Sequence, residues 1–190
     1  AMLLGLPCDV HDAGILRDDL GALERGLSAL SEQVDIIVTT GGASVGDHDL
    51  VQRALVNIGA QMDFWKVAMR PGKPLMAGKI GNAVVLGLPG NPSSAFVTAF
   101  LFLLPLIRHM AGCNAPLPAL FEAPTATDLP AGGDRAEYLR AIVEGGHITP
   151  LMVQDSGLTR TLSQANALLV QQPLVSSRSK GTMVQYMRLS

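Results

Sequence analysis

Apolar residues recur at every third or fourth position in two stretches, which predicts two helices that each bury one face. The first helix follows Asp18-Asp19, a pair that can cap it, and its apolar positions run from Leu20 to Val34. The second covers residues 47–58 and stops before Gly59. A third stretch, residues 93–110, is apolar almost all round, which is typical of a buried helix.

Shorter runs rich in apolar and β-branched residues predict strands. Residues 35–40 form a continuous run, as expected of a strand covered on both faces. Gly81-Asn82 separates two further runs and indicates a hairpin. The strands predicted in this part of the chain are residues 8–15, 35–40, 64–69, 75–79 and 83–88. Because strands alternate with loops and helices, we predict an α/β domain with a mainly parallel sheet.

The character of the chain changes near Gly112. Residues 115–134 contain four prolines, and the runs after them are short and separated by turns. These runs cover residues 137–144, 148–153, 167–171 and 182–189. We therefore predict an α/β domain at residues 1–112 and a small all-β domain at residues 113–190.

Composition excludes several classes of partner. The formal net charge is −2 and the basic residues are scattered, which argues against nucleic acid as the main ligand. The longest apolar run has 13 residues, whereas a membrane span needs about 20. Cys8 and Cys113 are far apart and indicate idle thiols. With no signal peptide at the start of the chain, we expect a cytoplasmic protein.

Two glycine-rich loops follow predicted strands and open predicted helices. Gly41-Gly-Ala-Ser-Val-Gly46 can present successive backbone N–H groups at a helix N-terminus, which suits a phosphate. The candidate ligands are Gly41, Gly42, Ser44 and Gly46. Taken alone, the same motif also fits an ordinary strand-to-helix turn.

Pro89-Gly-Asn-Pro-Ser-Ser94 repeats the arrangement, with two prolines that restrict the backbone around Gly90 and Asn91. A rigid turn of small residues suits a binding site. The alternative is a tight turn in which Ser93 or Ser94 simply caps the helix.

Charged residues supply the rest of the candidate chemistry. In Arg70-Pro-Gly-Lys-Pro74, a Pro-Gly turn holds two cations close together, which an anion between them would favour. Two solvated loop cations remain the alternative. Asp47 and Asp49 could hold Mg²⁺, which prefers oxygen ligands, or one of them could cap the second helix.

Three motifs together resemble the molybdopterin molybdenumtransferase family, of the MoeA and gephyrin E-domain type. They are Thr40-Gly-Gly-Ala-Ser-Val-Gly-Asp-His-Asp49, Phe64-Trp-Lys-Val-Ala-Met-Arg-Pro-Gly-Lys-Pro74 and Gly87-Leu-Pro-Gly-Asn-Pro92. The resemblance continues through Arg135-Ala-Glu-Tyr-Leu-Arg140 and covers nearly the whole chain.

The resemblance implies ligation of molybdate to the dithiolene of adenylylated molybdopterin (molybdopterin-AMP), with release of AMP and dependence on Mg²⁺. It implies that Gly41–Gly46 and the loop Pro89, Gly90, Asn91, Pro92 hold the pterin phosphate side. Molybdate would be handled by Arg70, Lys73, Ser94 and Arg135, and Asp49, which matches a functional acidic position, would be catalytic together with Lys73. For the fold, the resemblance implies a three-layer α/β/α domain followed by a small barrel-like β domain. A homodimer and a molybdopterin adenylyltransferase as partner are further expectations.

The chain departs from the family at its start. It opens on Met-Leu-Leu without a cap, as if inside a helix, and the resemblance implies that the first strand of the family's α/β domain is missing. Both an active enzyme and an inactive fragment are compatible with such a piece. Other readings remain open: a non-catalytic binding or dimerisation scaffold, and a molybdopterin adenylyltransferase. The latter would lack the Arg70–Pro74 motif and the trailing β domain.

Overall fold

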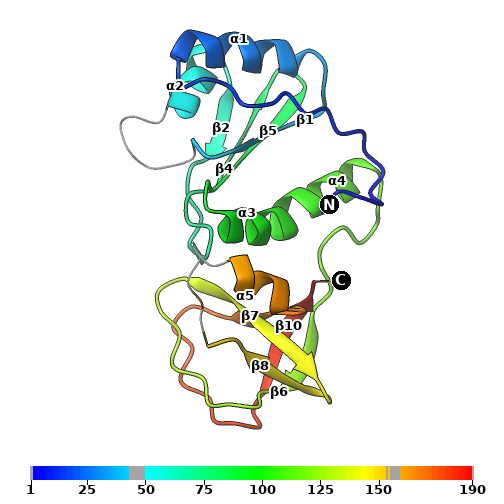
Figure 1. Ribbon diagram of the computed structural model, residues 1–190, viewed down its shortest axis with the longest axis vertical. Coiled ribbons are helices and arrows are strands. Elements are labelled where there is room, and N and C mark those ends of the chain that lie inside the picture. Colours follow the sequence, from blue (N-terminus) through cyan, green and yellow to red (C-terminus); the bar gives the residue numbers. More distant parts are fainter. Residues whose placement is uncertain (1, 43–49, 153, 155–158, 190) are drawn as a thin grey trace.

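The computed structural model describes residues 2–42, 50–152, 154 and 159–189, with the backbone alone at 159–161. Two sheets stand one above the other, with a long helix across the middle of the molecule (Figure 1). The upper sheet has the order β1-β5-β4-β2. Its strands are β1 Ile36–Thr40, β2 Gln61–Phe64, β4 Met76–Ile80 and β5 Ala83–Leu88.

Helices cover both faces of the upper sheet, which makes three layers (Figure 1). Helices α1 Leu20–Ser31 and α2 Leu50–Asn57 pack on one face through residues such as Leu27 and Leu55, which meet Val85 of β5. The neighbouring Leu86 points to the other face and packs against the long helix. Successive strand residues alternate between faces, so one apolar strand serves both cores.

The long helix is continuous but not uniform. It consists of α3 Pro92–Thr98, a π-helical segment η1 Ala99–Leu103 and α4 Leu104–Met110. Pro105 lacks the N–H that an α-helix would direct to Leu101, and the wider π turn immediately precedes it. Among the described residues, this is the one helix long and apolar enough to cross a membrane, yet 56% of its most apolar 18-residue window is buried inside the protein.

The lower sheet closes into a barrel. Its order is β3-β7-β9-β10-β6, and β8 pairs with β7. Thr125, just after β6, bridges Ile148 of β8, which joins the two ends. The strands are β6 Phe121–Pro124, β7 Ala136–Glu144, β8 His147–Pro150, β9 Ala167–Gln171 and β10 Met183–Arg188, with a short helix α5 Thr159–Gln164 before β9. The predicted barrel-like fold of this half is confirmed.

The two halves share an apolar cluster. Val97, Phe100 and Leu104 of the long helix contact Leu168 of β9, and Tyr138 of β7 packs against the same cluster. The barrel sheet thus has one face on its own core and one face on the long helix.

Several predictions were wrong in detail. The upper sheet is mainly antiparallel among the described strands, because only the β1–β5 pair is parallel. Residues 8–15 form no regular structure. The predicted strand 64–69 divides, since β2 ends at Phe64 and β3 Met69–Arg70 pairs with β7 in the lower sheet. A run of apolar residues cannot reveal that a chain passes from one sheet to another.

Candidate anion site between the two sheets

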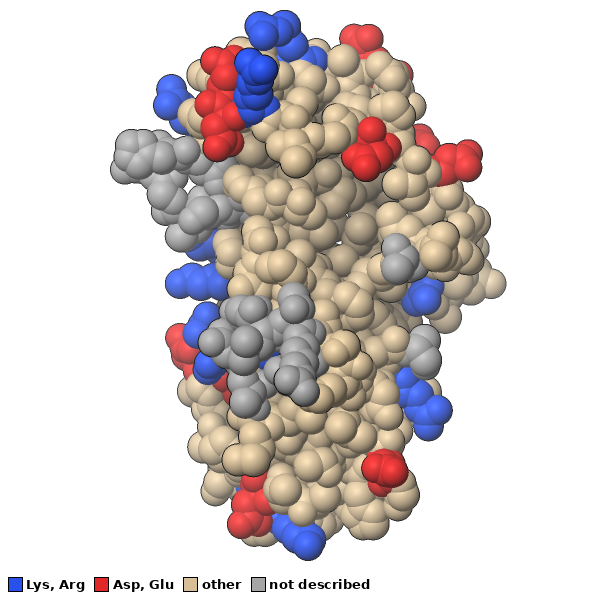
Figure 2. Space-filling model, in the orientation of Figure 1, with Lys and Arg blue, Asp and Glu red and all other residues tan. Residues whose placement is uncertain are grey.

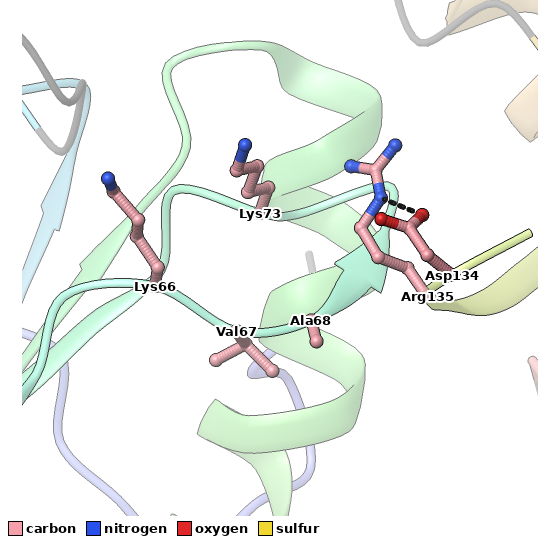
Figure 3. Close-up of a pocket in the computed structure, with 6 residues that line it drawn as sticks. All are labelled: Lys66, Val67, Ala68, Lys73, Asp134 and Arg135. Carbon is pink, nitrogen blue, oxygen red and sulfur yellow. Dashed lines mark ion pairs between the residues drawn. The ribbon is translucent and has the colours of Figure 1, made fainter. Parts of the chain in front are cut away.

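A pocket of about 500 Å³ lies where the upper and lower sheets meet. The segment between β2 and β4 lines it with Lys66, Val67, Ala68 and Lys73, and the residues just before β7 line it with Asp134 and Arg135. Figure 3 shows the amino groups of Lys66 and Lys73 and the guanidinium of Arg135 projecting from the same side of the backbone. Three cations and one carboxylate leave a formal charge of +2 (3 − 1) around the pocket.

The same region stands out on the surface. Figure 2 shows Lys and Arg side chains gathered along one flank, at the height where the two halves of the molecule meet. A group of cations of this kind attracts oxyanions, because each lysine and arginine can donate charge-assisted hydrogen bonds to oxygen.

The Arg70–Pro74 segment is held by hydrogen bonds within the turn and by close packing on the long helix. The Lys73 carbonyl accepts hydrogen bonds from the N–H groups of Val67 (3.1 Å) and Leu75 (3.0 Å). Gly72 has φ +109, and a Cβ placed on it would lie 2.4 Å from Thr98 Cγ2. Only glycine allows this backbone to lie so close to α3. Packing on the helix therefore sets where Lys73 stands.

Arg70 does not line the pocket, although it was predicted beside Lys73. Its Nη1 lies 3.5 Å from Glu137 Oε1, and the two residues are register partners in the β3–β7 pair. The Arg70 side chain is 62% exposed and that of Glu137 18%. The Glu137 carboxylate thus partly neutralises the positive charge of Arg70 that would otherwise attract an anion.

Arg135 stands at the edge of the pocket with its own carboxylate neighbour. Its Nε lies 3.5 Å from Asp134 Oδ1, and the Asp134 side chain is largely exposed (Figure 3). Ion pairs this open to water are weak, so the Arg135 guanidinium remains available to a ligand.

Lys66 is a site residue to which the sequence analysis gave no role. It belongs to the motif that also contains Arg70 and Lys73, and that membership was the available signal. Its position beside Lys73 depends on the turn of the chain between β2 and β3, which the spacing of residues does not show.

Arg140 is a second residue that the sequence analysis passed over. It is 2% exposed, and its Nη1 donates to Ser93 Oγ at 3.3 Å. Its Nε donates to Gln154 Oε1 at 3.4 Å, while Gln154 Nε2 returns a hydrogen bond to the Arg140 carbonyl at 2.9 Å. A buried guanidinium needs such partners, and here they tie β7 to the first turn of α3.

The two predicted glycine-rich loops meet at the upper sheet. Gly41 N–H donates to the Leu88 carbonyl at 3.2 Å, and a Cβ on Gly90 would lie 3.3 Å from Gly41 Cα. Gly42, like Gly41, has positive φ. The parallel pairing of β1 with β5 brings their carboxyl ends, and hence both loops, to one edge.

Asn91, and neither serine, caps α3. Its Oδ1 accepts from the N–H groups of Ser93 (3.1 Å) and Ser94 (3.3 Å), and Pro92 occupies the first turn. Ser94 is 7% exposed and does not line the pocket. Two amides that could have faced a phosphate are therefore already paired. A molybdate role for Ser94 stays a prediction.

Ser44, Gly46, Asp47 and Asp49 lie outside the described residues. Among the residues that the structure does describe, no group of three His, Cys, Asp or Glu side chains could hold a metal ion. The roles of Asp47 and Asp49 toward Mg²⁺ stay predictions.

Comparison with known families matches both halves of the chain. Residues 1–109 match the family described as "Probable molybdopterin binding domain". Residues 122–189 match "MoeA C-terminal region (domain IV)". The order of the two matches is that of the α/β and β-barrel halves.

Two similar curated proteins are both named molybdopterin molybdenumtransferase. A molybdopterin molybdenumtransferase of Haemophilus influenzae is 37% identical over 175 residues, which is 89% of this chain and 43% of that protein. One of Bacillus subtilis is 32% identical over 161 residues, covering 83% of this chain and 37% of that protein. The chain thus spans about two fifths of the length of these relatives.

Solved structures share the fold. The molybdopterin biosynthesis MoeA protein of Pyrococcus horikoshii superposes with a TM-score of 0.76 at 24% identity, over 93% of this chain and 43% of that one. Two family matches in sequence and this likeness in fold agree, and the chain belongs to the molybdopterin molybdenumtransferase family.

Proposed function

We propose that this chain binds molybdate and adenylylated molybdopterin, and that the protein to which it belongs ligates the metal oxyanion to the pterin dithiolene with release of AMP. The observation that carries the proposal is the convergence of Lys66, Lys73 and Arg135 on one pocket between the two sheets. The formal charge of +2 around the pocket is equal and opposite to that of molybdate.

The pocket would bind and orient the oxyanion. Lys66 and Lys73 can each donate to one oxygen, and the forked Arg135 guanidinium can donate to two. An oxyanion held in a fixed place near the dithiolene reacts as if it were at high local concentration. Because Lys66 and Lys73 would contact the oxygen atoms of molybdate, the molybdenum atom itself would stay free to react with the dithiolene.

The paired loops at Gly41 and Gly90 would hold the phosphate side of the pterin. A Cβ on Gly90 would lie 3.3 Å from Gly41 Cα, and the positive φ of Gly41 disfavours a side chain there, so the glycines let a phosphate lie close to the backbone. Two N–H groups at the start of α3 already donate to Asn91 Oδ1. We therefore propose that the loop Pro89–Pro92 shapes the binding site as well as donating hydrogen bonds to the phosphate.

Mg²⁺ would neutralise phosphate charge during release of AMP, and Asp47 and Asp49 are the carboxylates that we propose for it. A homodimer, a molybdopterin adenylyltransferase partner and a cytoplasmic location are part of the same proposal.

The direct test has two stages. Sodium molybdate is first titrated calorimetrically into the chain and into Lys66→Ala and Lys73→Ala variants, with Lys79→Ala as control. Lys79 is an exposed lysine of β4 outside the pocket. We expect about tenfold weaker binding for each pocket variant, from the loss of one charge-assisted hydrogen bond, and no change for Lys79→Ala.

AMP release from adenylylated molybdopterin, with Mg²⁺ and molybdate, is then measured for this chain and for one extended at its N-terminus. Release by both would place the whole site in these 190 residues. Release by the extended chain alone would make this part a binding unit. Release by neither, with molybdate still bound, would favour a scaffold, and equal binding by all variants would reject the pocket.

A further inference from the structure

Two backbone segments beside the pocket form a brace, and we infer that this brace positions the Arg135 guanidinium for the anion. The brace consists of residues 130–133, just before Arg135, and residues 171–175, at the end of β9 and after it. This inference rests on the proposed function, because it assigns a role around the same pocket.

Three hydrogen bonds tie the two segments together. Gly132 N–H donates to the Val175 carbonyl at 2.8 Å, and Leu174 N–H donates to the Gly133 carbonyl at 2.8 Å. The Gln171 side chain, 1% exposed, donates from Nε2 to the Pro130 carbonyl at 2.9 Å. The segment before Arg135 is therefore anchored along its length, although it belongs to no helix or strand.

Arg135 lies between two anchored points. On its N-terminal side, only Asp134 separates it from Gly133 of the brace. On its C-terminal side, Ala136 N–H donates to the Ala68 carbonyl at 3.1 Å, where β7 begins to pair with β3. With both flanks held, the backbone of Arg135 has little freedom, and its guanidinium is directed to the pocket (Figure 3).

The brace requires glycine at position 132. A Cβ there would lie 2.7 Å from the Gln172 carbonyl oxygen and 3.0 Å from Val175 Cγ1. The first of these atoms is backbone, so it cannot turn aside as a flexible side chain would. At the adjacent Gly133 a Cβ would meet nothing within 4 Å. The chain therefore offers a substitution and its matched control at neighbouring positions.

Leu174 shows that the brace is held at a cost. Its φ of +57 lies in the left-handed region, and among the described residues it is the one non-glycine with positive φ. Its side chain is 80% exposed, so packing does not account for this conformation. The conformation of Leu174 is explained by the hydrogen bond from its N–H to the Gly133 carbonyl, which closes the brace next to Arg135.

Gly132, Gln171 and Leu174 are thus positioning residues that act through Arg135. A guanidinium already held in place loses less conformational freedom when the anion binds, which strengthens binding without a new contact. The inference predicts that disturbing the brace weakens anion binding only while Arg135 is present.

The experiment is a calorimetric titration with sodium molybdate of the chain and four variants: Gly132→Ala, Gly133→Ala, Arg135→Ala and the double variant Gly132→Ala/Arg135→Ala. We expect about tenfold weaker binding for Arg135→Ala, about fivefold for Gly132→Ala and no change for Gly133→Ala. The double variant should bind no more weakly than Arg135→Ala. Near-ultraviolet circular dichroism checks that each variant is folded.

Each contrary result has its own meaning. If Arg135→Ala binds molybdate normally, the anion pocket of the proposed function fails. If Arg135→Ala is weaker but Gly132→Ala equals Gly133→Ala, the brace is overturned and the pocket stands. A further fivefold loss in the double variant would also overturn it, since Gly132 would then not act through Arg135.

A second variant covers the case in which Gly132→Ala does not fold. Gln171→Met removes the tie to Pro130 at nearly constant volume, and it also removes Oε1, a buried acceptor without a partner in the described structure. We expect weaker molybdate binding with Arg135 present and no effect in the Arg135→Ala background. Unchanged binding with Arg135 present overturns the inference.

Discussion

Arg140 Nη1 of β7 donates a hydrogen bond to Ser93 Oγ in the first turn of α3, across 3.3 Å and between residues 47 positions apart. Both residues are buried. This contact joins the barrel to the helix that covers the upper sheet. The relation between the two halves is therefore carried by polar as well as apolar contacts.

We predict that Arg140→Met lowers stability. The substitution keeps an unbranched apolar stem but removes the donor to Ser93 and Gln154, for a loss of about 2 kcal/mol, or a fall in melting temperature of roughly 4–8 °C. Differential scanning calorimetry measures it. Arg17→Met, an exposed arginine near the start of α1, serves as control and should melt as the parent chain does. Equal melting of the two variants would mean that the buried hydrogen bonds contribute nothing.

Glu137→Gln should strengthen molybdate binding about threefold, because it removes the negative charge that partly neutralises Arg70 and so makes the potential felt by the anion more positive. Calorimetry at low salt and at high salt checks this, and the gain should shrink at high salt. Melting should change little, since the pair is largely exposed on the arginine side.

Glu144→Gln is the control for that prediction, as Glu144 lies exposed at the far end of the same strand. It should leave molybdate binding unchanged. Weaker binding by Glu137→Gln would show instead that Glu137 aligns Arg70 for the ligand.

Gly72→Ala should weaken molybdate binding by displacing Lys73. The new Cβ would collide with Thr98 Cγ2, and the positive φ of Gly72 disfavours alanine as well. The double variant Gly72→Ala/Thr98→Ser removes the colliding methyl and should recover part of the affinity. It keeps a hydroxyl for the hydrogen bond that Thr98 Oγ1 donates to the Ser94 carbonyl.

Gly81→Ala separates strain from collision. Gly81 also has positive φ, at +56, but a Cβ there meets nothing within 4 Å. We expect a stability loss of about 1 kcal/mol from the backbone strain and normal molybdate binding. If Gly72→Ala and Gly81→Ala bind alike, close packing on α3 does not place Lys73.

Stability should fall in alkali through Tyr138. Burial raises the pKa of the Tyr138 phenol above its ordinary value of 10.0, because the interior disfavours the phenolate. The neutral phenol is favoured in the folded chain, so its contribution is complete below pH 10.0 and is lost as pH rises through the folded pKa. Urea unfolding at several pH values should show a smaller alkaline loss for Tyr138→Phe. Identical slopes would contradict the prediction.

The local pattern of residues was enough to predict most elements. Leucines spaced three and four apart after Asp19 predicted α1, and Asp19 caps it through a 2.7 Å hydrogen bond from Ala22 N–H. Gly81-Asn82 predicted the hairpin of β4 and β5. These features depend on neighbours a few residues away, so the sequence alone determines them.

Only the tertiary structure determined which of the predicted residues lie together at the anion pocket. The sequence by itself determined the family motifs, the glycine loops and the cations of Arg70–Pro74. It could not show that β3 would leave the upper sheet and pair with β7, because strand pairing between distant segments depends on the global packing of both sheets. Because β3 pairs with β7, Arg70 lies beside Glu137, and Arg135 reaches the pocket lined by Lys66 and Lys73. Arg140, further along β7, is buried and contacts Ser93.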